Sequence, residues 1–161
     1  HSGQYATLLY YLANSIWAAD GELETATRIF LLNKMLNGID LYYEVEMPPV
    51  FLIGHTVGMV FSKATYGNFC LFHQGCTVGR NFMDRPTLKE NVVLFPNSSV
   101  IGRCIIGSNV VISPGVQVIN QDIPDNCMVF NGKGNRLTFK DLDSIFVEKY
   151  FNINSKNYNG S

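Results

Sequence analysis

The sequence predicts a mainly β protein in which short strands wind into a triangular coil, with helices before and after it. Three observations predict this fold class. Aliphatic side chains recur at every sixth position, small or β-branched side chains recur four residues after them, and glycines lie close to both. A helix repeats every ~3.6 residues and a half-buried strand every ~2, so neither period explains a repeat of six.

The repeat is unbroken over six consecutive units, which disfavours a β-sandwich with accidental spacing. In a triangular coil, the large side chain fills the narrow interior and the small one fits beside it near a corner. Three units then close one turn, and successive turns place equivalent residues over each other. The large positions are Leu88, Leu94, Val100, Ile106, Ile112 and Val118, and the small positions are Val92, Ser98, Cys104, Val110 and Val116.

The same register extends toward the N-terminus, but one interval is irregular. The spacing between Val78 and Leu88 is ten residues rather than six, so residues 79–87 are predicted to form an inserted loop. Loops on a rigid solenoid are common places for binding residues. The large positions of this earlier stretch are Val60, Tyr66, Phe72 and Val78, and the small positions are Ala64, Cys70 and Cys76.

The flanking segments predict helices. Residues 5–19 and 22–36 carry apolar side chains at helical spacing, with a break at Gly21 and a stop signal at Asn37 and Gly38. The expected organisation is a helical hairpin at residues 4–40, a coil domain at 41–139 with its loop at 79–87, and a final helix at 140–152 that caps the open end of the coil.

The composition argues against several classes of protein. The net charge is −1 with no basic block, so a nucleic-acid surface is not expected, and no apolar run reaches the ~20 residues of a membrane span. None of the four cysteines belongs to a CxxC pair, which argues against zinc and redox motifs. We expect no metal, inert buried thiols and a cytoplasmic location.

Four motifs resemble those of the serine acetyltransferases and their relatives in surface-polysaccharide gene clusters, a branch of the hexapeptide-repeat acyltransferases. They are residues 31–40, residues 55–60 (HTVGMV), residues 74–79 (QGCTVG) and residues 122–126 (DIPDN). The resemblance covers residues 5–139. It implies a left-handed parallel β-helix, acetyl-CoA (coenzyme A) as the cofactor, and a homotrimer, because the active groove of the family is built from two neighbouring subunits.

In this family an aspartate and a histidine fifteen residues apart form a catalytic dyad, and Asp40 and His55 stand at that spacing. A hydroxyl is a poor nucleophile, so a histidine must accept its proton during attack on a thioester carbonyl. A carboxylate on the other ring nitrogen fixes the tautomer and stabilises the imidazolium. We predict His55 as the general base and Asp40 as its partner, against the alternatives of a turn histidine and an aspartate that ends the second helix.

Two departures from the family bear on the acceptor. The residue before the catalytic histidine of the family is an aspartate, whereas this chain has Gly54. The family loop carries Asp-Arg-His-Pro, in which the arginine and histidine hold the serine carboxylate; this chain has Asp84, Arg85 and Pro86 without the histidine. Asp84 and Arg85 are candidate acceptor-binding residues, against the alternative of a solvated pair. Many polysaccharide-cluster relatives share the missing loop histidine, which favours a sugar hydroxyl.

The remaining candidates are single residues. His73 follows an inward position and is a candidate acceptor contact or base, although a lone histidine there is more often structural. In the family the cofactor lies in a groove between adjacent coils and is met largely by backbone, so Gly79 and Gly115 are candidate contacts. Lys133 and Arg136 are candidates for its phosphates, against the alternative of solvated surface charges.

The sequence and the resemblance together predict an acetyl-CoA-dependent O-acetyltransferase acting on a sugar hydroxyl in surface-polysaccharide synthesis. The alternatives are a serine O-acetyltransferase, an N-acyltransferase that acts on an amino sugar, and a non-catalytic coil protein. The sugar O-acetyltransferase, the serine O-acetyltransferase and the N-acyltransferase share a cofactor and a histidine base, so only the acceptor distinguishes these three enzymes.

Overall fold

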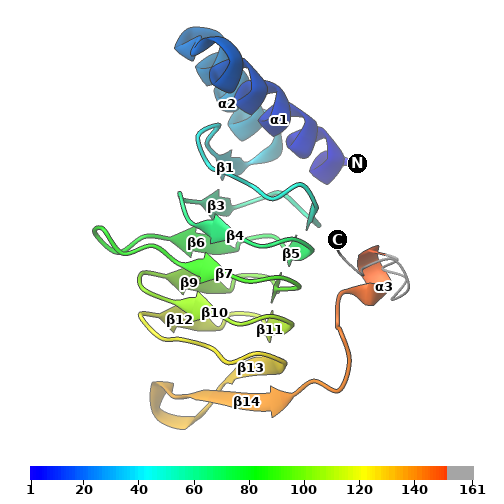
Figure 1. Ribbon diagram of the computed structural model, residues 1–161, viewed down its shortest axis with the longest axis vertical. Coiled ribbons are helices and arrows are strands. Elements are labelled where there is room, and N and C mark those ends of the chain that lie inside the picture. Colours follow the sequence, from blue (N-terminus) through cyan, green and yellow to red (C-terminus); the bar gives the residue numbers. More distant parts are fainter. Residues whose placement is uncertain (152–161) are drawn as a thin grey trace, which may run out of the picture.

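The computed structural model describes residues 1–151, apart from the side chains of Asp20 and Asn135. Its long axis runs from a helical hairpin at one end, through a stack of short strands, to a two-stranded end (Figure 1). Position 152, the last residue of the predicted final helix, lies outside the described residues.

Two helices form the hairpin, as the sequence predicts. Helix α1 spans Ser2–Asp20 and helix α2 spans Leu23–Asn37, and the two pack against each other. Each ends at a glycine in the left-handed region, with φ of 64° at Gly21 and 66° at Gly38. A side chain at either position would be strained, so these glycines fix where the helices stop.

The coil consists of three sheets whose strands are parallel from turn to turn, except at its end. The β1 sheet contains β1 (Ile39–Leu41), β3 (Met59–Phe61), β6 (Thr77–Gly79), β9 (Ser99–Ile101) and β12 (Gln117–Ile119). The β4 sheet contains β4 (Thr65–Tyr66), β7 (Thr87–Leu88) and β10 (Ile105–Ile106). The β2 sheet contains β2 (Phe51–Ile53), β5 (Cys70–Phe72), β8 (Val93–Leu94), β11 (Val110–Ile112), β13 (Cys127–Asn131) and β14 (Leu137–Asp141).

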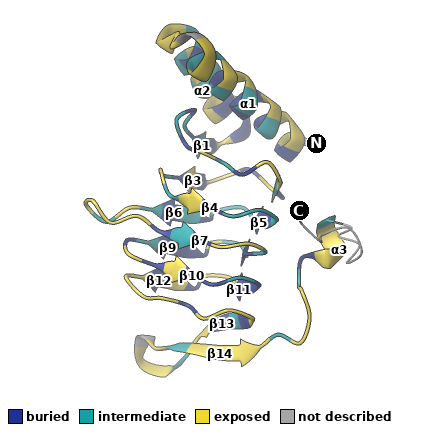
Figure 2. Cartoon of the chain, viewed as in Figure 1, coloured by how far each residue is buried: buried dark blue, intermediate teal, exposed yellow. Residues whose placement is uncertain are grey.

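The interior of the coil is the core, and its side chains stack in columns along the long axis. Figure 2 shows buried segments recurring along the stacked strands, whereas β14 is largely exposed. Because the pairing is in register, the large residue of one turn lies against that of the next. All four cysteines are buried free thiols, as expected. The column of the β2 sheet contains Ile53, Phe72, Leu94, Ile112 and Val129, and that of the β1 sheet contains Leu41, Phe61, Val78, Val100 and Val118.

One predicted inward position is wrong. Val60 is 42% exposed, and its neighbours Met59 and Phe61 are the buried residues of β3. Phe61 pairs with Val78 in the register of the sheets. The interval from Phe61 to Tyr66 is therefore five residues rather than six, because the corner between β3 and β4 is one residue shorter than the repeat.

The C-terminal segment differs from the predicted helix at 140–152. Its first two residues belong to β14, which pairs antiparallel with β13 and closes the coil end. Helix α3 is only Glu148–Phe151, and the segment before it runs back along the outer face of the β2 sheet. There Val147 is fully buried in a cluster with Leu71, Val93 and Val111. Outward aliphatic side chains on three consecutive strands thus give the segment a place to pack.

Truncating a core residue of one column tests this account of the fold. Leu94→Ala removes a fully buried side chain, and we expect it to lower the free energy of unfolding by about 2–5 kcal/mol. The measurement is urea denaturation followed by circular dichroism. Leu8→Ala is the matched control, because Leu8 is 61% exposed on α1 and its truncation should change stability by less than about 0.5 kcal/mol. Equal losses in both variants would contradict the assignment of the core.

Candidate active site

His55 stands on the corner of the coil that joins β2 to β3. The backbone on both sides of it is tied to neighbouring turns: Gly54 donates its N–H to the carbonyl of Phe72 at 2.8 Å, and Gly58 donates to the carbonyl of Gly38 at 2.9 Å. The His55 side chain is exposed. A solvent-accessible imidazole on a rigid corner is suited to proton transfer with a small molecule.

Asp40 lies in the middle of β1, directly opposite Val60 of β3. Its carboxylate accepts a hydrogen bond at Oδ2 from Nζ of Lys34, at 2.7 Å. The described residues contain no hydrogen bond between Asp40 and His55. The two segments are nevertheless in contact through the corner, since the Cα atom of Val57 is 3.5 Å from the Cβ position that a side chain at Gly38 would occupy.

His73 occupies the equivalent corner one turn farther along the coil. Its ring stacks on Phe95, with centroids 5.1 Å apart and planes inclined by 15°. Burial, and to a lesser degree the neighbouring His55, lowers the pKa of the His73 imidazole below its usual value. Nε2 of His73 is buried and has no hydrogen-bond partner within residues 1–151. The structure therefore places the His73 imidazole near His55, in surroundings that disfavour the charged form of His73.

The packing around His55 favours a glycine at position 54. A Cβ atom at Gly54 would lie 3.2 Å from Nδ1 of His73, which is tighter than an ordinary contact. His73 thus uses the space beside His55 that a side chain at Gly54 would take. A larger side chain at position 54 would require the His73 ring to shift by a few tenths of an ångström.

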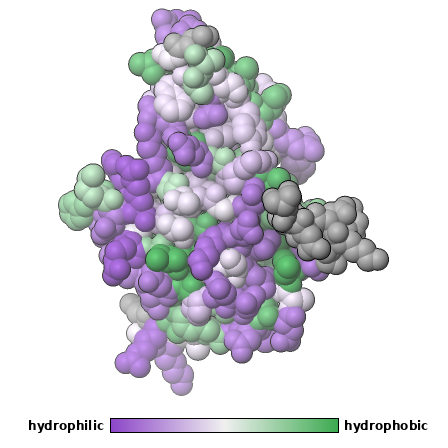
Figure 3. Space-filling view, in the orientation of Figure 1, coloured by the Kyte–Doolittle hydropathy of each residue, from purple (hydrophilic) through white to green (hydrophobic). Residues whose placement is uncertain are grey.

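The inserted loop leaves the coil between β6 and β7 and projects from one edge (Figures 1 and 3). A two-way backbone bridge between Asn81 and Asp84, both bonds at 3.0 Å, closes its tip. Phe82 and Met83 at the tip are 90% and 82% exposed. Asp84 is thus engaged through its backbone in shaping the loop, while Arg85 follows at its base.

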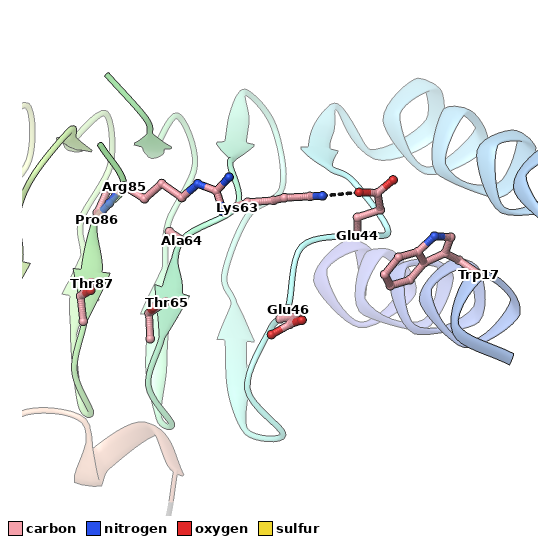
Figure 4. A pocket seen from close by; sticks show the side chains of 9 residues that line it. All are labelled: Trp17, Glu44, Glu46, Lys63, Ala64, Thr65, Arg85, Pro86 and Thr87. Atoms are coloured by element: carbon pink, nitrogen blue, oxygen red, sulfur yellow. Dashed lines mark hydrogen bonds and ion pairs between the residues drawn. The ribbon is translucent and has the colours of Figure 1, made fainter. Parts of the chain in front are cut away.

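Arg85 lines a cavity of about 460 Å³ beneath the helical hairpin (Figure 4). Acidic and basic side chains both reach it: Glu44 is ion-paired with Lys63, and Glu46 lies beside them. The cavity is lined by Trp17, Glu44, Glu46, Lys63, Ala64, Thr65, Arg85, Pro86 and Thr87. It offers charges of both signs at the wall of one small space.

His55 and Arg85 are not brought together within one chain. His55 precedes β3 and Arg85 follows β6, and these two strands are neighbours and parallel in the β1 sheet. The two side chains therefore lie beyond opposite ends of the strands of that sheet, His55 at the N-terminal ends and Arg85 at the C-terminal ends.

The candidate cofactor residues fall at two places. Gly115 and Gly132 line a cavity of about 480 Å³, and the loop with Lys133 and Arg136 adjoins it through a 2.7 Å bond from the N–H of Gly132 to the carbonyl of Arg136. Gly79 lies apart from this cavity, at the end of β6, in register with Ile101 and then Ile119. Ile119 lines the cavity, so the column leads from Gly79 toward it.

Several residues of these sites were not predicted as site residues. Lys34 lies within the motif at 31–40, but its approach to Asp40 depends on the turn at Gly38. Glu46, Lys63 and Phe95 come from three different turns of the coil, and no local spacing links them to Arg85 or His73. A charged residue in the last turn of α2 is the one signal that could have pointed to Lys34.

In the part of the chain that the structure describes, no three histidine, cysteine, aspartate or glutamate side chains gather as metal ligands would. Among the same residues, no helix has the length and apolar character needed to cross a bilayer.

Acidification is expected to destabilise the protein partly through His73. Because the folded state lowers the pKa of His73, the unfolded chain takes up a proton first, and stability present above the unfolded value of about 6.5 is lost as the pH falls through the folded value. Urea unfolding at pH 7 and pH 5 measures this loss, which should be smaller in His73→Gln. Arg136→Gln, a change at an exposed residue of another part of the coil, is the control. Equal losses in Arg136→Gln and His73→Gln would contradict the role of His73 in the pH dependence.

Comparisons with known proteins support the repeat and the fold of the coil. Residues 85–120 match the family model of the bacterial transferase hexapeptide (six repeats). A serine acetyltransferase of Synechococcus elongatus is 33% identical over 103 residues, which are 61% of this chain and 42% of that protein. The crystal structure of serine acetyltransferase isoform 3 from Entamoeba histolytica, in complex with cysteine, has a TM-score of 0.74 at 27% identity and covers 88% of this chain and 51% of that chain.

A serine acetyltransferase solved in complex with CoA has a TM-score of 0.75 at 17% identity, covering 86% of this chain and 58% of that chain, and at this identity the likeness concerns the fold. The chain spans about half the length of the relatives that it matches. All three carry the name serine acetyltransferase and give no support to the polysaccharide-cluster relatives. Residues 85–120 of the coil thus resemble the hexapeptide repeats of the bacterial transferases.

Proposed function

We propose that this protein is an acetyl-CoA-dependent O-acetyltransferase in which His55 is the general base and Asp40 orients it. The observation that carries the proposal is the exposed histidine on a rigid corner, beside the strand of Asp40, in a coil similar to that of serine acetyltransferases. An acyl transfer to a hydroxyl needs a base with access to solvent and a fixed orientation, and this corner supplies both.

The chemistry assigned to the chain is a proton relay. His55 accepts the proton of the acceptor hydroxyl while the hydroxyl oxygen bonds to the acetyl carbonyl carbon. Asp40 stabilises the imidazolium so formed. His55 then returns the proton to the sulfur as the carbon–sulfur bond breaks, which leaves the acetyl ester and the free thiol of coenzyme A. The histidine ends neutral, so one proton is moved and none is lost.

The residues present fit coenzyme A at the 480 Å³ cavity beside Gly115. A glycine in the wall allows a ligand to approach the backbone closely. Lys133 and Arg136 are exposed on the adjoining loop, where two cations suit the phosphates of the cofactor. Gly79 would extend the same groove along the column of Ile101 and Ile119 toward β6. When bound, acetyl-CoA supplies the activated acetyl group.

The acceptor we propose first is L-serine, because the relatives carry the name serine acetyltransferase. The cavity of Arg85 supports a zwitterionic acceptor, since Arg85 suits a carboxylate and Glu46 suits an ammonium group. A sugar hydroxyl is the second candidate. It is favoured by Gly54, which leaves His73 rather than a carboxylate beside the base, and by the absence of a histidine between Arg85 and Pro86.

The separation of the two proposed half-sites supports a homotrimer. Since His55 and Arg85 lie beyond opposite ends of the strands of the β1 sheet, the acceptor would be bound by Arg85 of one subunit and deprotonated by His55 of the next. A closed ring of head-to-tail contacts repeats this pairing, and a coil with three faces suits three subunits.

The first test is release of free thiol from acetyl-CoA by the purified protein. We expect release with L-serine, and a loss of about 10²–10⁴-fold in kcat/KM in His55→Ala, because the base is removed. A matched melting curve shows whether the variant is folded. Release that needs a sugar hydroxyl instead of serine would favour the second acceptor, and full activity in His55→Ala would overturn the dyad.

A second test asks whether the site is shared between subunits. His55→Ala and Arg85→Ala should each be inactive, and a refolded 1:1 mixture should regain about a quarter of the wild-type activity, since one interface in four then pairs an intact His55 with an intact Arg85. The control mixes His55→Ala with the double variant, which has no interface that is complete. No recovery in the first mixture would contradict a shared site.

A further inference from the structure

The Asp40 carboxylate has a partner outside the coil. Lys34 donates from Nζ to Oδ2 at 2.7 Å, and the Lys34 ammonium also lies 5.9 Å from the centre of the Phe30 ring. The two side chains of the pair are 51% and 36% exposed. The second oxygen of the carboxylate, Oδ1, has no partner among the described residues. One oxygen is therefore held by a cation and the other is left available.

The end of α2 that carries Lys34 is well fixed. The carbonyl of Lys34 accepts a 3.0 Å hydrogen bond from the N–H of Gly38, at the turn into β1. The buried amide of Asn37 donates to Oδ1 of Asn33, and the amide of Asn33 donates to the carbonyl of Ala6 on α1. Lys34 thus reaches Asp40 from a helix end that is anchored on the other helix of the hairpin.

We infer that Lys34 is a positioning residue for the proposed dyad: it holds Asp40 through Oδ2 and leaves Oδ1 to accept the ring N–H of His55. The inference rests on the proposed roles of Asp40 and His55. A carboxylate on an outward strand position can rotate freely, and a charged hydrogen bond to one oxygen limits that rotation. The cation also offsets part of the attraction between the carboxylate and an imidazolium.

A purely structural role for this pair predicts a different result. An exposed ion pair contributes little to stability, so its loss would change the melting curve slightly and leave the histidine unaffected. A positioning role instead changes the electrostatic surroundings of His55. The readout is therefore the ionisation of His55, which can be followed without catalytic turnover.

The experiment is an NMR pH titration of the His55 ring in the wild type, Lys34→Gln and Lys34→Arg, with His55→Gln to assign the signals. Lys34→Gln removes both the cation and the restraint on the carboxylate, so we expect the titration midpoint of His55 to differ from that of the wild type. Lys34→Arg keeps the cation and should match the wild type. His73 and His1, the other titrating rings near His55, are unchanged in these variants.

Two controls sharpen the result. Arg28→Gln removes another cation of α2, one that is paired with Glu24, and should leave the midpoint unchanged. Asp40→Asn should lower the midpoint, and adding Lys34→Gln to it should have no further effect, because Lys34 acts through the carboxylate. An unchanged midpoint in Lys34→Gln, or an equal shift in the Asp40→Asn background, would overturn the inference.

Kinetics separate this inference from the proposed function. In an active protein, Lys34→Gln should lower kcat/KM about fivefold and leave KM for acetyl-CoA unchanged, as expected for the loss of one exposed ion pair near the base. A protein that transfers no acetyl group to any acceptor, yet shows the predicted titration shifts, would overturn the proposed function and leave the Lys34–Asp40–His55 arrangement standing.

Discussion

The packing of inward side chains in register from turn to turn is the constraint on which the rest of the structure depends. Each large residue of a column, such as Leu94, rests on the equivalent residue of the turns on either side, here Phe72 and Ile112. A change of register by one residue would place these side chains in solvent. The corners are therefore held at fixed places, and the backbone positions of the corner residues are fixed with them.

Because the corners are fixed, the candidate base and the candidate acceptor-binding residue lie on different sides of the coil. His55, His73 and the Phe95 ring share one corner in successive turns. The loop with Arg85 leaves the β1 sheet at its other end, next to a cavity with charges of both signs. One narrow coil cannot fold these two sides onto each other, and this separation is the reason for proposing an acceptor site that two subunits share.

The helical hairpin positions a residue of the candidate site. It fixes the strand of Asp40 through the turn at Gly38, and its last turn supplies the lysine that holds the carboxylate. Apolar side chains also remain exposed on it, including Leu8, Leu31 and Met35 (Figure 3). At the other end, the segment with Val147 covers the outer aliphatic residues of the β2 sheet, so both flanks pack on the coil in different ways.

The sequence by itself determined the period of the coil, its helical hairpin, the extra loop and the burial of the cysteines, because each depends on residues that are close in the chain. It misplaced Val60, because a corner that is one residue shorter than the repeat has no local signal. It also misplaced the final helix, because the face on which that segment packs is made of three strands far apart in the sequence. It named His55 and Asp40 through a family resemblance. Only the tertiary structure decided that Lys34 holds Asp40, that His73 fills the space beside Gly54, and that Arg85 lies on the far side of the coil, since these contacts join segments whose separation in sequence has no fixed period.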